Sequence, residues 1–386
     1  MKHHIILHAG LPKTGTSSVQ QALHGYADEH CAYASWGDLA NHSRPYILGF
    51  TDRVFRQKAE KQGGRNRSEL EALRAQSRAQ LQQVVARAPQ RVLIFSAEVF
   101  GGAGVDALRD FVETLAPWTD TIEAICYVRP AVSTMASAFQ QQCKLSPEKI
   151  TLPPRVRYRA AIEPLFDVIG ANVTVLPYAR AELREGDVVL DFAHRCGVTL
   201  ASDYKRANTS MTAEAAALLV WHGRHKRTRP ATVDSIRVQN QLVKWISTLG
   251  SARLHFAPSL VLPALEKMRA DLEWIEQLMG RSMADPENAQ SGGIASEDDL
   301  LKLAQSVEAE LSDLIAARSE AARLRIDLDA TRAIADPARR LAALVDHLKD
   351  IAEYQVTRPA SDAESRSAGL MQHLRAGLGL MRRRVQ

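Results

Sequence analysis

Four short apolar runs, each about as long as a β-strand, punctuate the first half of the chain. They cover residues 3–9, 91–98, 122–128 and 172–178. Unbroken apolar runs of this length are typical of strands buried on both faces, as in a parallel sheet. Helical stretches such as 68–87, with apolar positions at three- and four-residue spacing, lie between them. The alternation predicts an α/β fold: a three-layer, doubly wound, mostly parallel sheet that binds its ligand at the carboxyl ends of the strands.

The pattern becomes helical after residue 212. We expect an α/β domain over residues 1–287, a linker over 288–296 because of its Gly and Ser content, and a helical extension over 297–386. The extension ends in a basic amphipathic stretch, LMQHLRAGLGLMRRR. Such a stretch favours weak peripheral contact with an anionic membrane, although it more often packs against its own protein.

The composition is that of a globular protein, with 46% hydrophobic and 24% charged residues among 386. Four cysteines occur singly and without C-x-x-C spacing, so we expect reduced thiols and a cytoplasmic protein. The first apolar run starts too early to leave room for a secretory leader, and no window is long and apolar enough to span a membrane.

The net charge of +5 is unevenly distributed. Residues 53–91 hold ten Lys or Arg against three Glu. This excess favours an anionic partner, although a solvated helix face is the commoner explanation of such a run. We expect a small-molecule partner and no nucleic acid.

A strand, a glycine-containing turn and a helix follow one another in HIILHAGLPKTGTSSVQQAL, near the N-terminus. This order points backbone N–H groups and a helix N-terminus at an anion. Gly10 and Gly15 match the spacing of the ATP and GTP loop G-x-x-x-x-G-K-[ST], but Thr16 stands where that loop has its Lys. The only lysine, Lys13, precedes the second glycine. The turn therefore predicts a different phosphoryl ligand.

The core of this turn, P-K-T-G-T, resembles the P-loop-like 5′-phosphosulfate loop of sulfotransferases. Enzymes of that family move a sulfuryl group from 3′-phosphoadenylyl sulfate (PAPS) to a hydroxyl or an amine. PAPS carries a single phosphate at its 5′ end, so a lysine directed at β and γ phosphates has no purpose there. The resemblance implies that the 5′-phosphosulfate is bound by Pro12, Lys13, Thr14, Gly15, Thr16 and Ser17.

A second match follows the third apolar run, where the chain reads YVRPAVSTMASAFQQ. Sulfotransferases have an Arg at the end of this strand and a Ser eight residues later, and both bind the 3′-phosphate. Arg129 and Ser137 have that spacing. A guanidinium makes charge-assisted forked hydrogen bonds to phosphate, and a hydroxyl adds a further donor. Reading this phosphate selects PAPS over other adenylyl nucleotides.

The order of the later segments resembles a bacterial branch of the family that modifies glycans and small carbohydrates. The segments are VTVLPYARAELREGDVVLDFAHRCGV and KRANTSMTAEAAALL, and the resemblance extends over residues 3–285. It implies a carbohydrate or small-molecule acceptor. The chain departs from that branch after Arg129, where Pro130, Ala131 and Val132 replace its usual polar and aromatic residues.

The acceptor hydroxyl must lose a proton as it attacks sulfur, so a His or a carboxylate must lie within hydrogen-bond reach. The resemblance places Glu98 in this role, and its alternative is to cap the next helix or pair with an Arg. His8 is the second candidate base, although a histidine in an apolar strand is more often a core residue. Lys13 would neutralise charge on the oxygen that leaves sulfur. The resemblance implies no metal.

Two other classes of protein stay open. A nucleoside-triphosphate-dependent kinase would use Glu98 to hold Mg²⁺, and a non-catalytic scaffold would bind an adenosine phosphate and recruit a partner through the helical extension. A basic cluster lies at residues 222–229, and Lys205 and Arg206 lie shortly before it. These residues either contact an acidic acceptor or the nucleotide, or they form a solvated helix end. Binding of adenosine 3′,5′-bisphosphate, compared with ATP and Mg²⁺, distinguishes the enzyme from the kinase.

Overall fold

The computed structural model describes residues 2–52, 67–145, 150–200, 211–227 and 234–357. It divides into two compact units. The α/β unit takes its described residues from 1–141, 151–210 and 255–295, and the helical unit takes them from 142–150, 211–254 and 296–386.

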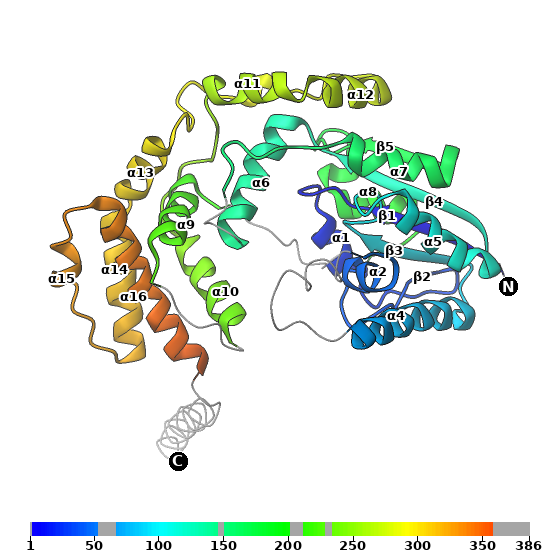
Figure 1. Ribbon diagram of the computed structural model, residues 1–386, viewed down its shortest axis with the longest axis horizontal. Coiled ribbons are helices and arrows are strands. Elements are labelled where there is room, and N and C mark those ends of the chain that lie inside the picture. Colours follow the sequence, from blue (N-terminus) through cyan, green and yellow to red (C-terminus); the bar gives the residue numbers. More distant parts are fainter. Residues whose placement is uncertain (1, 53–66, 146–149, 201–210, 228–233, 358–386) are drawn as a thin grey trace, which may run out of the picture. The chain divides into compact units, whose positions relative to one another are not determined.

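A five-stranded sheet in which every pairing is parallel lies at the centre of the α/β unit (Figure 1). Its strand order is β2-β3-β1-β4-β5. The predicted runs all appear in it, with ends that differ from the prediction by at most a few residues. β2 was not predicted, because three residues are too few to show a pattern. The strands are β1 His3–Ala9, β2 Cys31–Tyr33, β3 Val92–Ala97, β4 Thr119–Val128 and β5 Val173–Pro177.

Helices cover both faces of this sheet (Figure 1). On one face Ile6 packs with Val19 of α1 and Phe192 of α8 in one buried cluster. On the other face Phe95 contacts the ring of Phe111 on α5. The layered α/β fold with a parallel sheet is therefore confirmed. The covering helices are α1 Thr16–Leu23 and α8 Val188–Arg195 on the first face, and α2 Ser43–Phe50, α4 Arg67–Arg87, α5 Val105–Leu115 and α7 Arg159–Ile169 on the second.

The strand order creates a point at which neighbouring strands send the chain in opposite directions. From β1 the chain passes through α1 to β2 at one edge, whereas from β4 it passes to β5 at the other edge. β1 and β4 are neighbours in the sheet, so the segments that follow them leave in opposite directions. Open α/β sheets bind ligands at such a switch point, at the carboxyl ends of their strands.

Three further helices contribute to the α/β unit. α6 (Ala131–Leu145) follows β4, and α11 (Pro258–Lys267) and α12 (Arg269–Met279) come from a later part of the chain. The expected linker, 288–296, contains the boundary between the units at Ala295. It is also hydrogen-bonded, because the backbone of Ile294 pairs with His255 and Ala257 at 2.9 Å each.

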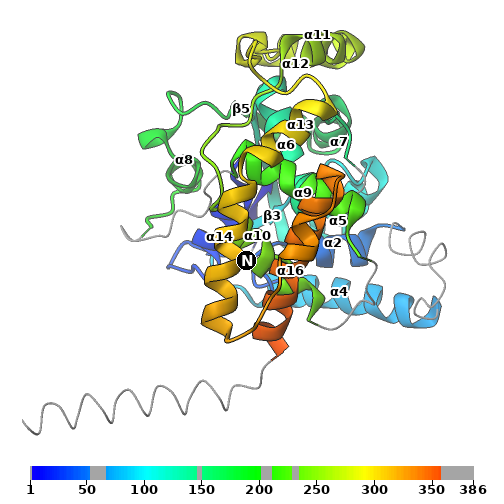
Figure 2. The ribbon, with the colours of Figure 1, turned by 90° about the vertical axis from the view of Figure 1, so that its left-hand side faces the viewer.

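The helical unit forms around α9, which is buried along most of its length. Residues 211–254 join this unit, whereas the sequence pattern placed them in the α/β domain; ten buried positions all around α9 require helices on every side. α14 and α16 run side by side (Figures 1 and 2). The helices are α9 Ala213–His225, α10 Ser235–Ile246, α13 Glu297–Ser306, α14 Glu308–Ala322, α15 Asp329–Arg332 and α16 Pro337–Thr357.

Much of the basic cluster at 222–229 is used inside this unit. Arg224 pairs with Glu297 of α13 at 2.6 Å. The backbone and side chain of Arg227 donate to Asp346 of α16 at 3.1 and 3.2 Å, and His222 lies 3.3 Å from the same carboxylate. These contacts join α9 to α13 and α16, so the described arginines stabilise helix packing.

Asp346→Ala is expected to lower the free energy of unfolding by about 2–3 kcal/mol, since it removes a buried carboxylate and its charged hydrogen bonds. The pKa of Asp346 is lowered to about 2 despite burial, because His222 and Arg227 stabilise its charged form. The stabilisation of the folded state by Asp346 is fully present above the ordinary carboxyl pKa and is lost as the pH falls towards 2. Urea unfolding at pH 7 measures the loss.

Asp350→Ala is the matched control, because Asp350 pairs with the same arginine but is 41% exposed. Its expected cost is within about 0.5 kcal/mol. Equal losses for the two variants would contradict a specific role for the buried carboxylate.

Candidate active site at the carboxyl ends of β3, β1 and β4

The loop between β1 and α1, residues 10–15, depends on two glycines. A Cβ atom at Gly10 would lie 2.2 Å from Oγ1 of Thr16, and one at Gly15 would lie 2.5 Å from Cγ1 of Val188. Gly15 also has φ of 78°, in the left-handed region that glycine adopts without steric cost. The loop therefore passes close to α1 and α8 in a form that larger residues would prevent.

Lys13 has an unusual backbone conformation in this loop. Its φ is 70°, one of four positive values at non-glycine residues in the described chain. For a lysine this conformation costs about 1–2 kcal/mol. The side-chain Nζ donates to Oε1 of Gln141 on α6 at 3.4 Å. The loop thus holds the lysine in a strained backbone that directs its ammonium towards α6.

The N-terminus of α1 has no side-chain cap, because Gly15 occupies the N-cap position. The hydroxyls of Thr14 and Thr16 are buried and donate to the carbonyl of Leu11 at 2.8 and 3.4 Å. They stabilise the loop from within, whereas Pro12 and Ser17 are exposed. First-turn N–H groups without a cap are available to an anion.

Glu98 follows directly after β3, next to β1 in the sheet. Its backbone N–H donates to Oγ of Ser43 on α2 at 3.0 Å. Although Glu98 is exposed, protein atoms around its carboxyl displace water and raise its pKa, while the charge of Lys13 acts in the opposite direction. Glu98 and Lys13 are thus close enough to interact, and Glu98 forms no ion pair with a described arginine.

Arg129 follows directly after β4, on the other side of β1. Its carbonyl accepts hydrogen bonds from Tyr158 Oη at 2.8 Å and Thr134 Oγ1 at 3.0 Å. Its guanidinium carbon lies 5.9 Å from the centre of the Tyr178 ring. The backbone around Arg129 is held firmly, and the side chain remains half-buried.

Tyr178 is a site residue that the sequence pattern did not identify. It follows β5, and its N–H donates to the carbonyl of Val128 at 2.7 Å. The same ring that contacts Arg129 comes within 3.5 Å of a Cβ placed at Gly15. Tyr178 therefore links the arginine to the β1–α1 loop. The available signal was its place at the carboxyl end of a predicted strand.

Ser137 lies on α6, four residues before Gln141 and four after Ser133. Residues four apart share a helix face, so Ser137 lies on the face that Gln141 uses to meet Lys13. The first N–H groups of α6 are occupied by Asp285, whose carboxylate accepts from Val132 at 2.7 Å. A phosphate near α6 must therefore use side chains, and Arg129 and Ser137 offer them.

His8 lies in the core and not at the surface of the site. It is 0% exposed, with its ring 4.6 Å from that of Phe192 and its Nδ1 2.8 Å from Oγ of Ser96. Burial lowers its pKa to about 3. His8 cannot reach an acceptor in this fold, so the second candidate base does not fit the geometry.

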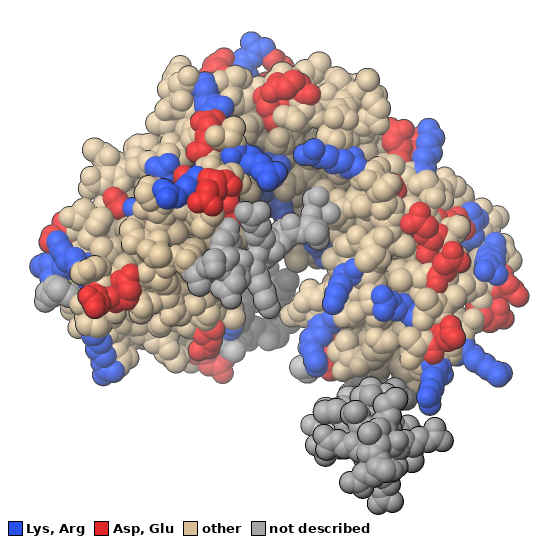
Figure 3. Space-filling view, turned by 180° about the vertical axis from the view of Figure 1, so that it is seen from behind, with Lys and Arg blue, Asp and Glu red and all other residues tan. Residues whose placement is uncertain are grey.

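Basic residues elsewhere are mixed with acidic ones. On the face drawn in Figure 3, Lys and Arg are interspersed with Asp and Glu over the described surface. In the basic run at 53–91, Arg74 pairs with Asp52 and Arg91 with Asp120, at 2.8 and 2.9 Å. Lys205, Arg206, residues 53–66 and the basic C-terminal stretch lie outside the described residues.

Models of known protein families give no match to this chain, and the curated proteins contain no significant match. In the described ranges, no helix is both long and apolar enough to cross a membrane. The same ranges contain no group of three or more His, Cys, Asp or Glu side chains placed to hold a metal ion. Any functional conclusion therefore depends on the site residues themselves.

Proposed function

We propose that this protein is a PAPS-dependent sulfotransferase that modifies a hydroxyl or an amine. The observation that carries the proposal is that Lys13 lies near enough to Glu98 for its charge to act on the carboxyl, beside the uncapped N-terminus of α1 and at the switch point of the sheet. A loop that a Cβ atom at Gly10 or Gly15 would block, beside a helix N-terminus that no side chain caps, fits a single 5′-phosphosulfate. Arg129 and Ser137, on the β4 side, fit the 3′-phosphate.

In the reaction, the acceptor oxygen forms a bond to sulfur as the bond from sulfur to the 5′-phosphate oxygen breaks. Glu98 takes the proton of the acceptor, and the raised pKa of its carboxyl makes it a stronger base than an ordinary glutamate. Lys13 neutralises the charge that develops on the departing phosphate oxygen. The products are the sulfated acceptor and adenosine 3′,5′-bisphosphate. A carbohydrate acceptor follows from the resemblance alone.

Adenosine 3′,5′-bisphosphate is expected to raise the melting temperature without any metal, and Arg129→Ala is expected to remove most of that rise. A charge-assisted contact to phosphate contributes roughly 1.5–3 kcal/mol, or one to two orders of magnitude in affinity. Thermal shift with and without EDTA, followed by calorimetry, measures both.

Arg109→Ala on α5 is the control, because Arg109 is half-exposed and, among the described residues, pairs with Asp106 on its own helix. It should leave the response to nucleotide unchanged. If adenosine 5′-monophosphate stabilises the protein equally, the 3′-phosphate is not recognised. If ATP with Mg²⁺ stabilises it more strongly, the kinase is the better assignment.

A further inference from the structure

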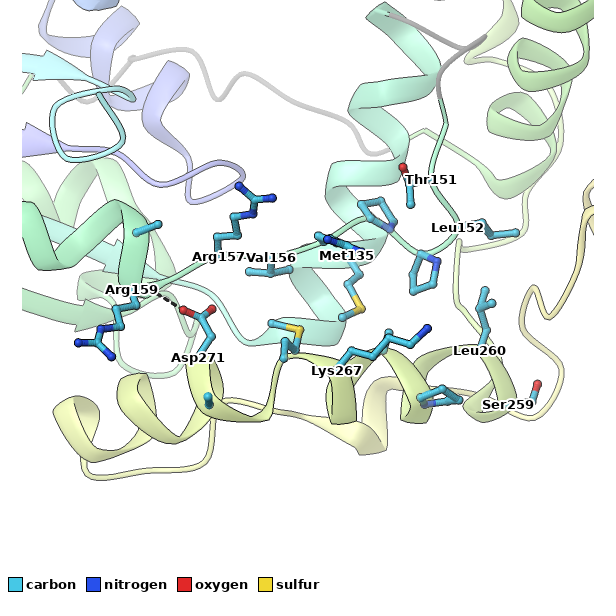
Figure 4. A pocket seen from close by; sticks show the side chains of 18 of the residues that line it. Met135, Thr151, Leu152, Val156, Arg157, Arg159, Ser259, Leu260, Lys267 and Asp271 are labelled. Carbon is cyan, nitrogen blue, oxygen red and sulfur yellow. Dashed lines mark hydrogen bonds between the residues drawn. The ribbon is translucent and has the colours of Figure 1, made fainter. Parts of the chain in front are cut away.

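A cavity of about 870 Å³ lies within the α/β unit, between α6, the segment at residues 151–163 and the α11–α12 pair (Figure 4). This volume is in the range of small-molecule sites. The cavity is separate from the loop residues of the proposed active site. Met135 enters it from α6, whereas Lys267 on α11 and Arg157 lie on opposite walls (Figure 4).

The walls of this cavity are mainly aliphatic. Met135, Leu152, Val156, Leu260 and Met268 contribute apolar surface, together with three prolines. Its lining, all of it within the described chain, contains no aromatic ring and no Asn or Gln. Sugars are commonly held by aromatic faces and by polar groups that fix orientation, so these walls suit an aliphatic chain better.

Positively charged residues outnumber negatively charged ones in the cavity lining. Four cationic residues and two acidic residues line it. Glu163 is paired with Arg159 at 2.7 Å, and Asp271 accepts from the backbone N–H groups of Tyr158 and Arg159 at 2.8 Å. The side chains of Arg155, Arg157 and Lys267 make no hydrogen bond or ion pair to another described residue. The cavity lining therefore carries a net formal charge of +2 beside an aliphatic surface, and three of its cationic side chains are unpaired among the described residues.

We propose that this cavity binds a single anionic amphiphile, with its unbranched aliphatic chain against the apolar walls and its anionic head at Arg155 and Arg157. The charge complementarity and the aliphatic lining are the observations that carry this assignment. The proposal needs neither the nucleotide nor sulfuryl transfer, so it can fail or succeed independently of the proposed function.

Decanoate, kept below its micelle concentration, is the probe, and calorimetry of the full chain without nucleotide is the measurement. Decanoate should bind with one-to-one stoichiometry, and octanoate should bind about fourfold more weakly for each CH₂ removed, because a buried CH₂ contributes about 0.8 kcal/mol. Decyltrimethylammonium should bind at least tenfold more weakly. Equal binding of the cation, or affinity independent of chain length, would overturn the proposal.

Two variants test the anionic head and the aliphatic chain of the ligand separately. Arg155→Gln combined with Arg157→Gln should weaken decanoate roughly tenfold without changing the preference for longer chains. Ala264→Phe, which fills the cavity from α11, should abolish binding while the charges stay in place. Arg325→Gln in the helical unit, an exposed arginine far from the cavity in sequence, is the control. Unchanged affinity in both cavity variants, with the fold intact by circular dichroism, would show that decanoate binds elsewhere.

Discussion

Replacing Glu98 with Gln is expected to lower the rate of sulfuryl transfer from PAPS by roughly two to four orders of magnitude, the usual contribution of a positioned base. The amide keeps the size of the side chain, and the backbone bond from residue 98 to Ser43 does not involve the carboxyl. Affinity for adenosine 3′,5′-bisphosphate should therefore stay within about twofold. Single-turnover transfer to a panel of glycans and small alcohols measures the rate.

The pH dependence gives a second readout for Glu98. The base acts when deprotonated, so transfer should rise with pH through the pKa of Glu98, which its surroundings hold above the ordinary value. This acidic limb should disappear in Glu98→Gln and persist in the control Glu113→Gln, an exposed residue of α5. Transfer at the parent rate by Glu98→Gln would exclude it as the base. A requirement for Mg²⁺, abolished by chelation, would favour the kinase.

Lys13→Ala is expected to lower kcat by about two to three orders of magnitude, the loss seen when one preorganised donor to a developing charge is removed. Charge on the departing oxygen grows mainly in the transition state, so nucleotide affinity should fall much less. Alanine is preferred to glycine, because it retains a Cβ and with it the backbone cost of the positive φ. The comparison of kcat with the dissociation constant of adenosine 3′,5′-bisphosphate decides the role.

A surface lysine gives the matched control for this change. Lys302→Ala on α13 removes a charge that is 76% exposed, and it should leave both constants unchanged. A loss of affinity in Lys13→Ala as large as the loss of turnover would make Lys13 a binding residue only. The strained loop would then need another explanation.

The sheet and the position of the loop could be predicted, because both follow from local pattern. Apolar runs located four strands, and the glycine spacing located the turn that follows β1. β2 and α2 could not be predicted. The three residues of β2 are too few to show a pattern, and they form a strand because they pair with β3. The assignment of α9 to the helical unit depends equally on distant partners.

The site could be predicted only in its local parts. Lys13, Glu98 and Arg129 each follow a predicted strand, so their placement at one sheet edge was foreseeable. Tyr178 and Asp285 were not, because their contacts join residues far apart in the chain. The hydroxyls of Thr14 and Thr16 also turn inward, a direction that residue type alone does not determine.

At Lys13, which has a left-handed backbone conformation, selection for stability and selection for function favour different residues. For folding alone, glycine is the favoured residue at a φ of 70°, so random substitution followed by selection for stability would drift towards it. We expect lysine to be retained at such a position while the function of its side chain outweighs the stability lost through its backbone conformation. In a lineage without the proposed activity, this position would be among the first to change to glycine, and that change would stabilise the protein.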